Sequence, residues 1–285
     1  MPVPKVVEVA TLAAFTKEIE RLLAITQRGT ASMAMPNNWY RGHSLADSFE
    51  LKPGLYRHSS LTTFEDLYDL EDEMMIAFQN QAILHNYGGA SNQTPMTKLF
   101  YMQHYGVPTR LLDWTTNPYI ALYFALSGAK VDGATGSYSQ PAAVWVLDPW
   151  KWNQWSMASL GWPRERGPAD LDDKDVVSYH PKSSENRRGS SIYQYPVAIV
   201  GAPNTQRMFA QRGAFTVFGG DLRAMEVMYR DTGAPSDGLM QLRVPQASIA
   251  ALLKTLMSLG YTDSVAYPDL QGLAMEIKRL NGFSV

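Results

Sequence analysis

The amino-acid sequence predicts an α+β fold in which helices pack against small, bent, mixed or antiparallel sheets. Apolar runs at helical spacing and short runs at strand spacing follow one another without a regular strand–helix–strand alternation. The sequence also lacks a glycine-rich phosphate turn between a predicted strand and a helix. Both observations argue against a parallel, doubly wound sheet.

The first part of the chain predicts three helices and one short strand. Leu12, Phe15 and Ile19 recur on one face of residues 8–27, which indicates an amphipathic helix. The run Trp39-Tyr40-Arg41-Gly42 is typical of a short strand followed by a turn. Apolar residues at helical spacing predict two further helices, over residues 64–86 and 95–105.

A fourth helix is expected to begin at Asn117-Pro118, with Thr115 or Thr116 as its cap and Pro118 in its first turn. This helix is apolar nearly all round, and we therefore expect it to be buried. Later strands are expected over residues 142–147, 195–201, 214–218 and 239–244, with a helical turn over 205–211 and helices over 246–259 and 268–280.

The expected organisation is an N-terminal helical segment over residues 1–37 and one domain over residues 38–285. Residues 150–195 form the least regular stretch, because four tryptophans there are interrupted by glycine, proline and charge. We interpret this stretch as an insertion or cover of the domain. Its tryptophan-rich part, residues 150–162, is also a candidate surface for a partner.

Composition excludes several classes of function. A net charge of −2 argues against the broad basic surface of a duplex-DNA binder. The absence of cysteine excludes disulfides and thiolate chemistry and fits a reducing, cytoplasmic location. The N-terminus is a poor signal peptide, and no stretch approaches the ~20 apolar residues needed to cross a bilayer, so no membrane partner is expected.

Several motifs of known chemistry are also missing. The sequence contains no phosphate-binding loop ending in Lys-Ser or Lys-Thr, no GxSxG elbow and no HExxH. Its five histidines are scattered, and none pairs with another at the spacing of metal ligands. We therefore expect no metal.

Arg41 is the first candidate site residue. Burying an arginine is unfavourable unless it pairs with an anion, and its planar fork suits a phosphate or carboxylate. The following Gly42 lets another backbone or a ligand approach closely. From this residue alone, an internal salt bridge to an acidic residue is a better explanation of Arg41 than a ligand.

The second candidate is the segment over residues 103–114, which places polar side chains in an otherwise apolar run. Buried polar groups must be paired, so the segment is either an internal hydrogen-bond network or the wall of a pocket. Arg110 and Asp113 are a possible pair within it. Trp114 offers a flat face for a base. The candidate residues of this segment are His104, Thr109, Arg110, Asp113 and Trp114.

A third segment, residues 206–216, places Arg207 and Gln211 four residues apart on one expected helix face. The helix runs into a glycine and then a strand. Alone, this pattern indicates only a joint between a helix and a strand with a polar face.

Together these segments resemble the FRG domain family, a bacterial and phage-associated group with an aromatic-Arg-Gly motif. The motif reads Tyr40-Arg41-Gly42 here, and the central block resembles residues 103–125, including TRLLDWTTNPYIALYFA. A third block resembles RMFAQRGAFTVF, and YPDLQGLAMEI is similar to the closing motif. These four blocks extend the resemblance over residues 38–280.

The resemblance implies a distant relation to ADP-ribosyltransferases, which have a split β-sandwich and use NAD as a substrate. It implies that Arg41 and Gly42 contact the dinucleotide and that Tyr123 or Trp114 stacks on the nicotinamide. Arg207 and Gln211 would complete the polar wall. The cofactor site would also include His104, Thr109, Arg110 and Asp113, of which Arg110 and Asp113 orient it. Tyr123 and Gln211 are the catalytic candidates. The family relation calls for a catalytic glutamate, but the corresponding position here is Gln211.

The resemblance therefore implies an NAD-dependent ADP-ribosyltransferase or an NAD-cleaving enzyme, acting as a toxin or an anti-phage effector. Its acceptor would be a protein or a nucleic acid, and an antitoxin is a possible partner. The alternatives are a nucleotide- or nucleic-acid-binding module without catalysis and an interaction scaffold of a defence system.

Overall fold

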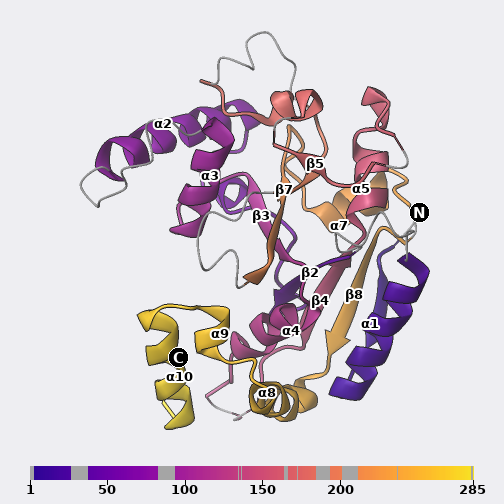
Figure 1. Ribbon diagram of the computed structural model, residues 1–285, viewed down its shortest axis with the longest axis vertical. Helices are drawn as coiled ribbons and strands as arrows, with labels where there is room; N and C mark the ends of the chain where they lie inside the picture. Colours follow the sequence, from indigo (N-terminus) through magenta and orange to yellow (C-terminus); the bar gives the residue numbers. More distant parts are fainter. Residues whose placement is uncertain are drawn as a thin grey trace.

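The computed structural model describes residues 3–26, 38–82, 94–133, 135, 137–163, 166–171, 173–183, 193–200, 211–235, 237–283 and 285. Within these residues, one mixed eight-stranded sheet is accompanied by helices on both of its faces (Figure 1). This arrangement confirms the predicted α+β class.

The strands follow the order β1-β8-β4-β2-β3-β7-β6-β5 across the sheet. The terminal pairs β1–β8 and β5–β6 are parallel, and all pairs between them are antiparallel. The strands are β1 (Lys5–Glu8), β2 (Trp39–His43), β3 (Leu111–Thr115), β4 (Ala142–Leu147), β5 (Ala169–Asp170), β6 (Val197–Val200), β7 (Gly213–Val217) and β8 (Leu239–Val244).

The sheet nearly divides in its middle, between β2 and β3. Every residue of β2 pairs with β4, but β2 meets β3 at a single residue pair, Tyr40 with Thr115. The sequence predicted separate small sheets, and the structure instead joins two four-stranded halves at this one point. We call this point the β2–β3 junction.

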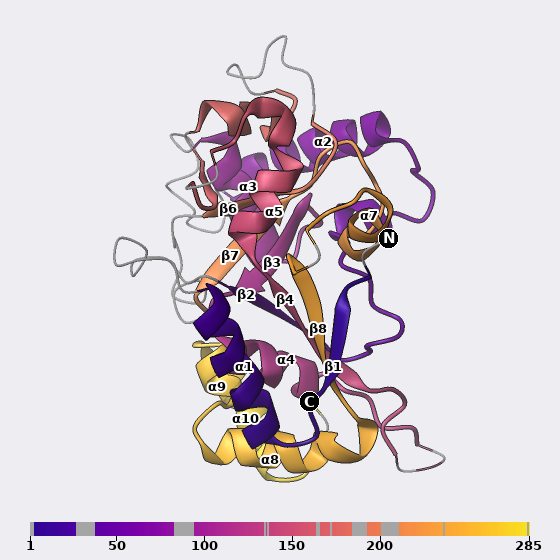
Figure 2. The ribbon, with the colours of Figure 1, turned by 90° about the vertical axis from the view of Figure 1, so that its right-hand side faces the viewer.

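The helices gather at two ends of the molecule (Figures 1 and 2). One end holds α1 (Leu12–Thr26), α4 (Pro118–Ser127), α8 (Ile249–Ser258), α9 (Asp263–Ala266) and α10 (Leu270–Leu280). The other holds α2 (Phe64–Ala82), α3 (Pro95–His104) and α5 (Pro149–Ser156), with α7 (Met225–Asp231) close to the middle of the sheet. Short 3-10 helices occupy residues Leu55–Arg57, Ala158–Leu160, Lys174–Tyr179 and Gln246–Ser248. None of the helices in the described ranges is long and apolar enough to cross a membrane.

The central helix α4 begins at a side-chain cap. Asn117 accepts hydrogen bonds from the backbone N–H groups of Tyr119 and Ile120, and Pro118 occupies the first turn. The cap is therefore Asn117 and neither of the two expected threonines. Thr115 instead accepts a hydrogen bond from the N–H of Asn117 and so fixes the cap residue itself. Buried residues on several sides of α4 confirm that the helix is enclosed in the core.

Helix α4 lies directly on β2 at Gly42. A Cβ atom at this position would lie 2.1 Å from the carbonyl oxygen of Ala121 and 2.6 Å from the backbone nitrogen of Ala125. Gly42 is therefore required by the close approach of a second backbone, which is one of the two explanations that the sequence left open.

The structure confirms most of the predicted elements, but sequence reasoning missed several. Strand β1, strand β3 and the helices α5 and α7 were not predicted. β1 pairs with β8, and Phe15 of α1 lies in the same core cluster as residues of α4 and α8, so the N-terminal segment packs on the rest of the chain. The helical turn expected over residues 205–211 lies almost entirely outside the described residues.

The tryptophan-rich stretch is packed against the sheet. Trp152 is buried and donates a hydrogen bond from Nε1 to the carbonyl oxygen of Pro196 at 2.7 Å. Asn153 exchanges two hydrogen bonds with the backbone of Ala198 in β6. This stretch therefore anchors α5 to β6, and Trp152 is not available as a partner surface.

Replacing Gly42 with alanine tests the contact between α4 and β2. We expect Gly42→Ala to lower the free energy of unfolding by about 3 kcal/mol, at the upper end of the cost of overpacking, because both contacting atoms belong to backbone. The measurement is urea unfolding followed by circular dichroism.

Gly54→Ala is the matched control. Gly54 has a helical backbone (φ −56°), and a Cβ there would meet its nearest neighbour, Pro108, at 3.6 Å. We expect this variant to be neutral or up to about 1 kcal/mol more stable. Equal stability of the two variants would contradict the close approach of α4.

Candidate functional site

A cavity of about 350 Å³ lies over the β2–β3 junction. Residues from β2, β3, β7, α3, α4 and the segment after α9 form its walls. They are Tyr40, Arg41, Gly42, Phe100, Gln103, His104, Asp113, Trp114, Thr115, Phe124, Gln211, Gly213, Phe215 and Tyr267. The cavity therefore brings together Arg41, the 103–114 segment and Gln211, which the sequence had singled out separately.

Arg41 crosses the junction. The pairing of Tyr40 with Thr115 places the side chains of Arg41 and Asp113 on opposite faces of the sheet, and they meet because β2 and β3 separate beyond this pair. The guanidinium donates from Nη1 to the backbone carbonyl oxygen of Asp113 at 2.6 Å. This hydrogen bond takes the place of a ladder bond that the separated strands no longer make.

The charge of Arg41 is only partly compensated. Its Nη1 lies 3.9 Å from Oδ2 of Asp113, and 27% of the Arg41 side chain is exposed. Burial lowers the pKa of Arg41, while the charge of Asp113 raises it. An arginine stays protonated at neutral pH under such shifts, so Arg41 presents a positive charge to the cavity.

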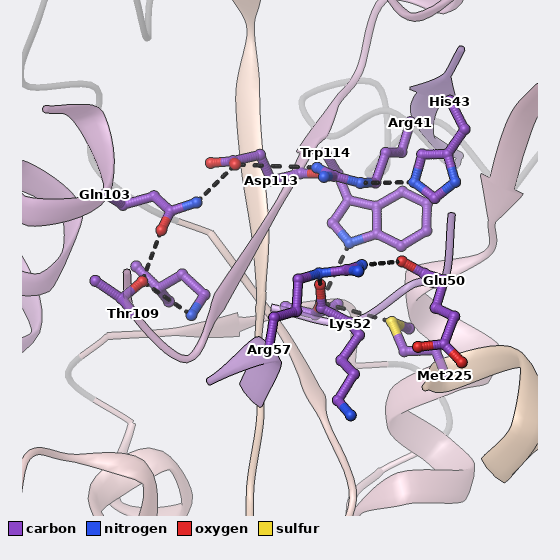
Figure 3. A network of polar contacts seen from close by, with 12 residues as sticks. Arg41, His43, Glu50, Lys52, Arg57, Gln103, Thr109, Asp113, Trp114 and Met225 are labelled. Carbon is purple, nitrogen blue, oxygen red and sulfur yellow. Dashed lines mark hydrogen bonds and ion pairs between the residues drawn. The ribbon is translucent and has the colours of Figure 1, made fainter. Parts of the chain in front are cut away.

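His43 holds Arg41 from the other side (Figure 3). Nε of Arg41 donates to Nε2 of His43 at 3.2 Å, and His43 stacks edge-on against Phe49. Burial and the positive charge of Arg41 lower the pKa of His43 to about 3. The ring is therefore neutral and serves as a hydrogen-bond acceptor for Arg41. Sequence reasoning overlooked this residue, although its spacing of two from Arg41 places both on one face of β2.

Asp113 is positioned by a short chain of hydrogen bonds. Thr109 donates from Oγ1 to Oε1 of Gln103 at 2.7 Å, which leaves Nε2 of Gln103 to donate to Oδ2 of Asp113 at 2.7 Å (Figure 3). The Asp113 side chain is 52% exposed. Among the described residues that line the cavity, Asp113 is the only carboxylate.

Gln211 connects the cavity to the C-terminal helices. Its Nε2 donates to the carbonyl oxygen of Ala266, the last residue of α9, at 2.9 Å. Its backbone oxygen accepts from Oγ1 of Thr115 at 2.5 Å. The next residue, Arg212, has a positive φ of 48°, a conformation that is unfavourable for a side chain of this kind and marks the turn into β7.

The aromatic wall differs from the one expected. Tyr123 of α4 is fully buried in a hydrophobic core cluster, and the neighbouring Phe124 lines the cavity instead. Phe124 meets Tyr267 edge-on, with ring centroids 5.6 Å apart. The Trp114 indole is 3% exposed and donates to Oγ1 of Thr216 at 3.2 Å, so its flat face is not available for a base.

Arg110 does not reach the cavity. It forms a fully buried ion pair with Glu71, with 2.8 Å between Nε and Oε2. Its other nitrogens donate to the carbonyl oxygens of Phe218 and Tyr179, at 3.1 and 2.8 Å. The suggested pairing of Arg110 with Asp113 is wrong, because Glu71 on α2 faces Arg110 in the core. Arg110 is a structural arginine that joins α2 to β3 and β7.

The remaining candidate residues either line the cavity or support a residue that lines it. His104 and Gly42 line the cavity, whereas Thr109 is buried behind Gln103 and supports it. Arg207 lies outside the described residues. Within those residues, no group of three histidine or acidic side chains is placed to hold a metal ion.

Residues 36–133 match the family model of the FRG domain, and the chain therefore contains an FRG domain over this range. No curated protein and no solved structure matches the chain. The matched range includes the Tyr40-Arg41-Gly42 motif and the central block over residues 103–125. It does not include the two later blocks, whose resemblance to the family stays a prediction.

The two arginines are expected to differ in their effect on stability. Arg110→Ala removes one partner of a fully buried ion pair and should lower the free energy of unfolding by about 3–5 kcal/mol. Arg41→Ala removes hydrogen bonds at the edge of a cavity that water can enter, and should cost about 1–2 kcal/mol. Chemical unfolding of both variants measures the difference. A loss for Arg41→Ala as large as that for Arg110→Ala would identify Arg41 as structural.

The buried, neutral His43 predicts a pH dependence of stability. Its pKa is about 3 in the folded protein and about 6.5 in an unfolded chain, so between these values only the unfolded state binds a proton. The contribution of His43 to stability is therefore present above pH 6.5 and is lost as the pH falls toward 3.

His43→Gln provides the comparison, because glutamine retains an acceptor for Arg41 and does not titrate. As the pH falls below 6.5, we expect the wild type to lose stability relative to this variant. The loss in unfolding free energy should be up to about 1.4 kcal/mol per pH unit. Parallel stability curves from pH 7.5 to pH 5 would show that His43 takes up a proton as readily in the folded state as in the unfolded state, and would contradict the lowered pKa.

Proposed function

We propose that this FRG-domain chain binds NAD at the Arg41–Asp113 cavity and cleaves the bond between nicotinamide and ribose. The ADP-ribosyl group then passes to an acceptor or to water. One observation carries the proposal: a guanidinium with incomplete compensation and a half-exposed carboxylate border one cavity that also has aromatic walls. A cation, an anion and aromatic rings are the groups that a dinucleotide with a charged nicotinamide ring requires.

In the proposed reaction, the electron pair of the bond between C1′ and the nicotinamide nitrogen leaves with nicotinamide, which becomes neutral. Positive charge then develops on the ribose. The Asp113 carboxylate supplies the stabilising negative charge, and this stabilisation is stronger in the transition state than in the ground state. The attacking hydroxyl or water gives its proton to Asp113 as the new bond to C1′ forms.

The other walls have complementary roles in this proposal. Phe124 and Tyr267 contact the nicotinamide ring, in place of the expected Tyr123 and Trp114. The side-chain oxygen of Gln211 accepts a hydrogen bond from a ribose hydroxyl while its nitrogen remains bonded to Ala266. The nearly divided sheet supports a relation to the split β-sandwich of ADP-ribosyltransferases. A role as a toxin or anti-phage effector rests on the family resemblance, as do an antitoxin and a protein or nucleic-acid acceptor.

One observation favours a second candidate, a nucleotide-binding module without catalysis. The residue at the expected glutamate position, Gln211, is uncharged and holds α9 through its amide. In this candidate, Asp113 only completes the hydrogen-bond chain from Thr109 and Gln103. The two candidates make the same prediction for binding and opposite predictions for nicotinamide release.

Purified protein incubated with NAD labelled in the nicotinamide ring separates the candidates. We expect nicotinamide release by the wild type and at least a 100-fold slower release by Asp113→Asn, which retains the hydrogen bond from Gln103 but not the charge. Arg41→Lys should also lose activity, because an ammonium cannot reproduce the two-sided contacts of a guanidinium. Binding of NAD without release by the wild type would select the module.

A further inference from the structure

A second arginine, Arg57, lies close to Arg41 and belongs to none of the motifs that the sequence singled out. It ends the 3-10 helix Leu55–Arg57, and its side chain extends toward the part of the molecule that holds Arg41 and His43 (Figure 3). The positive charge of Arg57 lowers the pKa of both Arg41 and His43, after the larger effect of burial in each. Figure 3 draws both arginines in one close view, and the direction of these pKa shifts agrees with two like charges that repel.

Backbone carbonyl groups hold Arg57 in place. Nη2 donates to the oxygen of Glu50 at 2.6 Å, and Nε donates to the oxygen of Lys52 at 3.2 Å. The segment itself is anchored, because the N–H of Leu55 donates to the oxygen of Thr109 and the hydroxyl of Tyr56 donates to the oxygen of Gly219. Arg57 is thus positioned in advance on a fixed segment.

The positive charge of Arg57 reaches the Glu226 carboxylate only from a distance: burial raises the pKa of Glu226, and Arg57 is among the smaller effects that lower it. Among the described residues Arg57 forms no ion pair, and Figure 3 shows the Glu50 carboxylate pointing away from both guanidinium groups. The nearby Glu226 carboxylate accepts hydrogen bonds from the N–H of Leu51, at 3.1 and 3.3 Å. The carboxylate nearest to Arg41, that of Asp113, is 3.9 Å away and half exposed, so it offsets the repulsion between the two guanidinium groups only in part. An anion between the two groups removes the remaining repulsion.

We propose that Arg57 and Arg41 together form a phosphate-binding site that holds the diphosphate of a nucleotide next to the cavity. Each guanidinium has one terminal nitrogen with no partner among the described residues: Nη1 of Arg57 and Nη2 of Arg41. Guanidinium groups bind phosphate oxygens through charge-assisted hydrogen bonds. The identity of the nucleotide as NAD rests on the proposed function, but the phosphate site does not.

Calorimetric titration with inorganic pyrophosphate and with ADP-ribose tests this site directly. We expect the wild type to bind both probes, with affinity that falls as salt rises. Arg57→Met and Arg57→Gln should each weaken binding about 10-fold to 100-fold. Arg57→Lys, which retains the charge, should bind with intermediate affinity. Arg21→Met removes an equal charge from an exposed position on α1 and should bind as the wild type does.

Arg57→Gln is the decisive variant, because its amide retains one hydrogen bond to the segment and thermal unfolding shows whether the fold persists. If Arg57→Gln and a folded Arg57→Met bind both probes as tightly as the wild type, Arg57 is only structural and the proposal fails. Absence of binding of both probes to the wild type overturns it too. Binding of pyrophosphate without ADP-ribose overturns the assignment to a nucleotide.

The same titrations separate this inference from the proposed enzyme. Arg57-dependent binding of ADP-ribose by a protein that releases no nicotinamide supports the phosphate site and contradicts the enzyme. Conversely, the protein could release nicotinamide while its Arg57 variants bind both probes as the wild type does. That result would support the enzyme and contradict the phosphate site.

Discussion

The hydrogen bond from Arg41 to the backbone carbonyl of Asp113 spans the weakest point of the sheet. β2 and β3 share one residue pair, and beyond it the described residues form no ladder between the two four-stranded halves. Each residue of the aromatic-Arg-Gly motif has a separate task at this point. Tyr40 makes the single pair and fills the core, Arg41 bridges the gap, and Gly42 admits the backbone of α4. The motif therefore joins the two halves of the sheet and also leaves a positive charge at the edge of the cavity.

The contrast between Arg41 and Arg110 shows how context decides the role of an arginine. Both are followed by strand residues and both contact backbone carbonyls, yet Arg110 has a carboxylate at 2.8 Å and Arg41 has its nearest one at 3.9 Å. A fully buried guanidinium must be paired, and Arg110 is paired on every side. A guanidinium held by a neutral histidine and a carbonyl retains its capacity to bind an anion. The same reasoning applies to Arg57, which is held by carbonyls alone.

The sequence could predict what depends on local periodicity and not what depends on partners far along the chain. The helices with clear apolar spacing and strands such as β4 and β8 are found near the predicted positions. β3 was missed because it is only five residues long and lies in a segment flanked by helices, and its pairing with β7 identifies it as a strand. For the same reason the sequence could not show that Tyr123 faces the core and Phe124 the cavity, since α4 is apolar on both sides. Glu71, the partner of Arg110, lies 39 residues away and carries no local signal.

Two parts of the chain form the walls of the cavity, and this affects which ligands the cavity can accept. Arg41, Gln103 and Asp113 lie within the matched FRG range, whereas Gln211, Phe215 and Tyr267 lie beyond it. The charged groups thus come from the FRG domain, which also supplies most of the aromatic wall, and later elements complete that wall with Phe215 and Tyr267. These elements are held firmly: Asp263 at the start of α9 is fully buried and accepts two hydrogen bonds from Arg279 of α10, and Gln211 joins α9 to β7. Charge determines which chemical group the cavity binds, and the shape of the walls determines which whole molecule fits. Chains that share the matched range can therefore share an anion site and still accept different ligands.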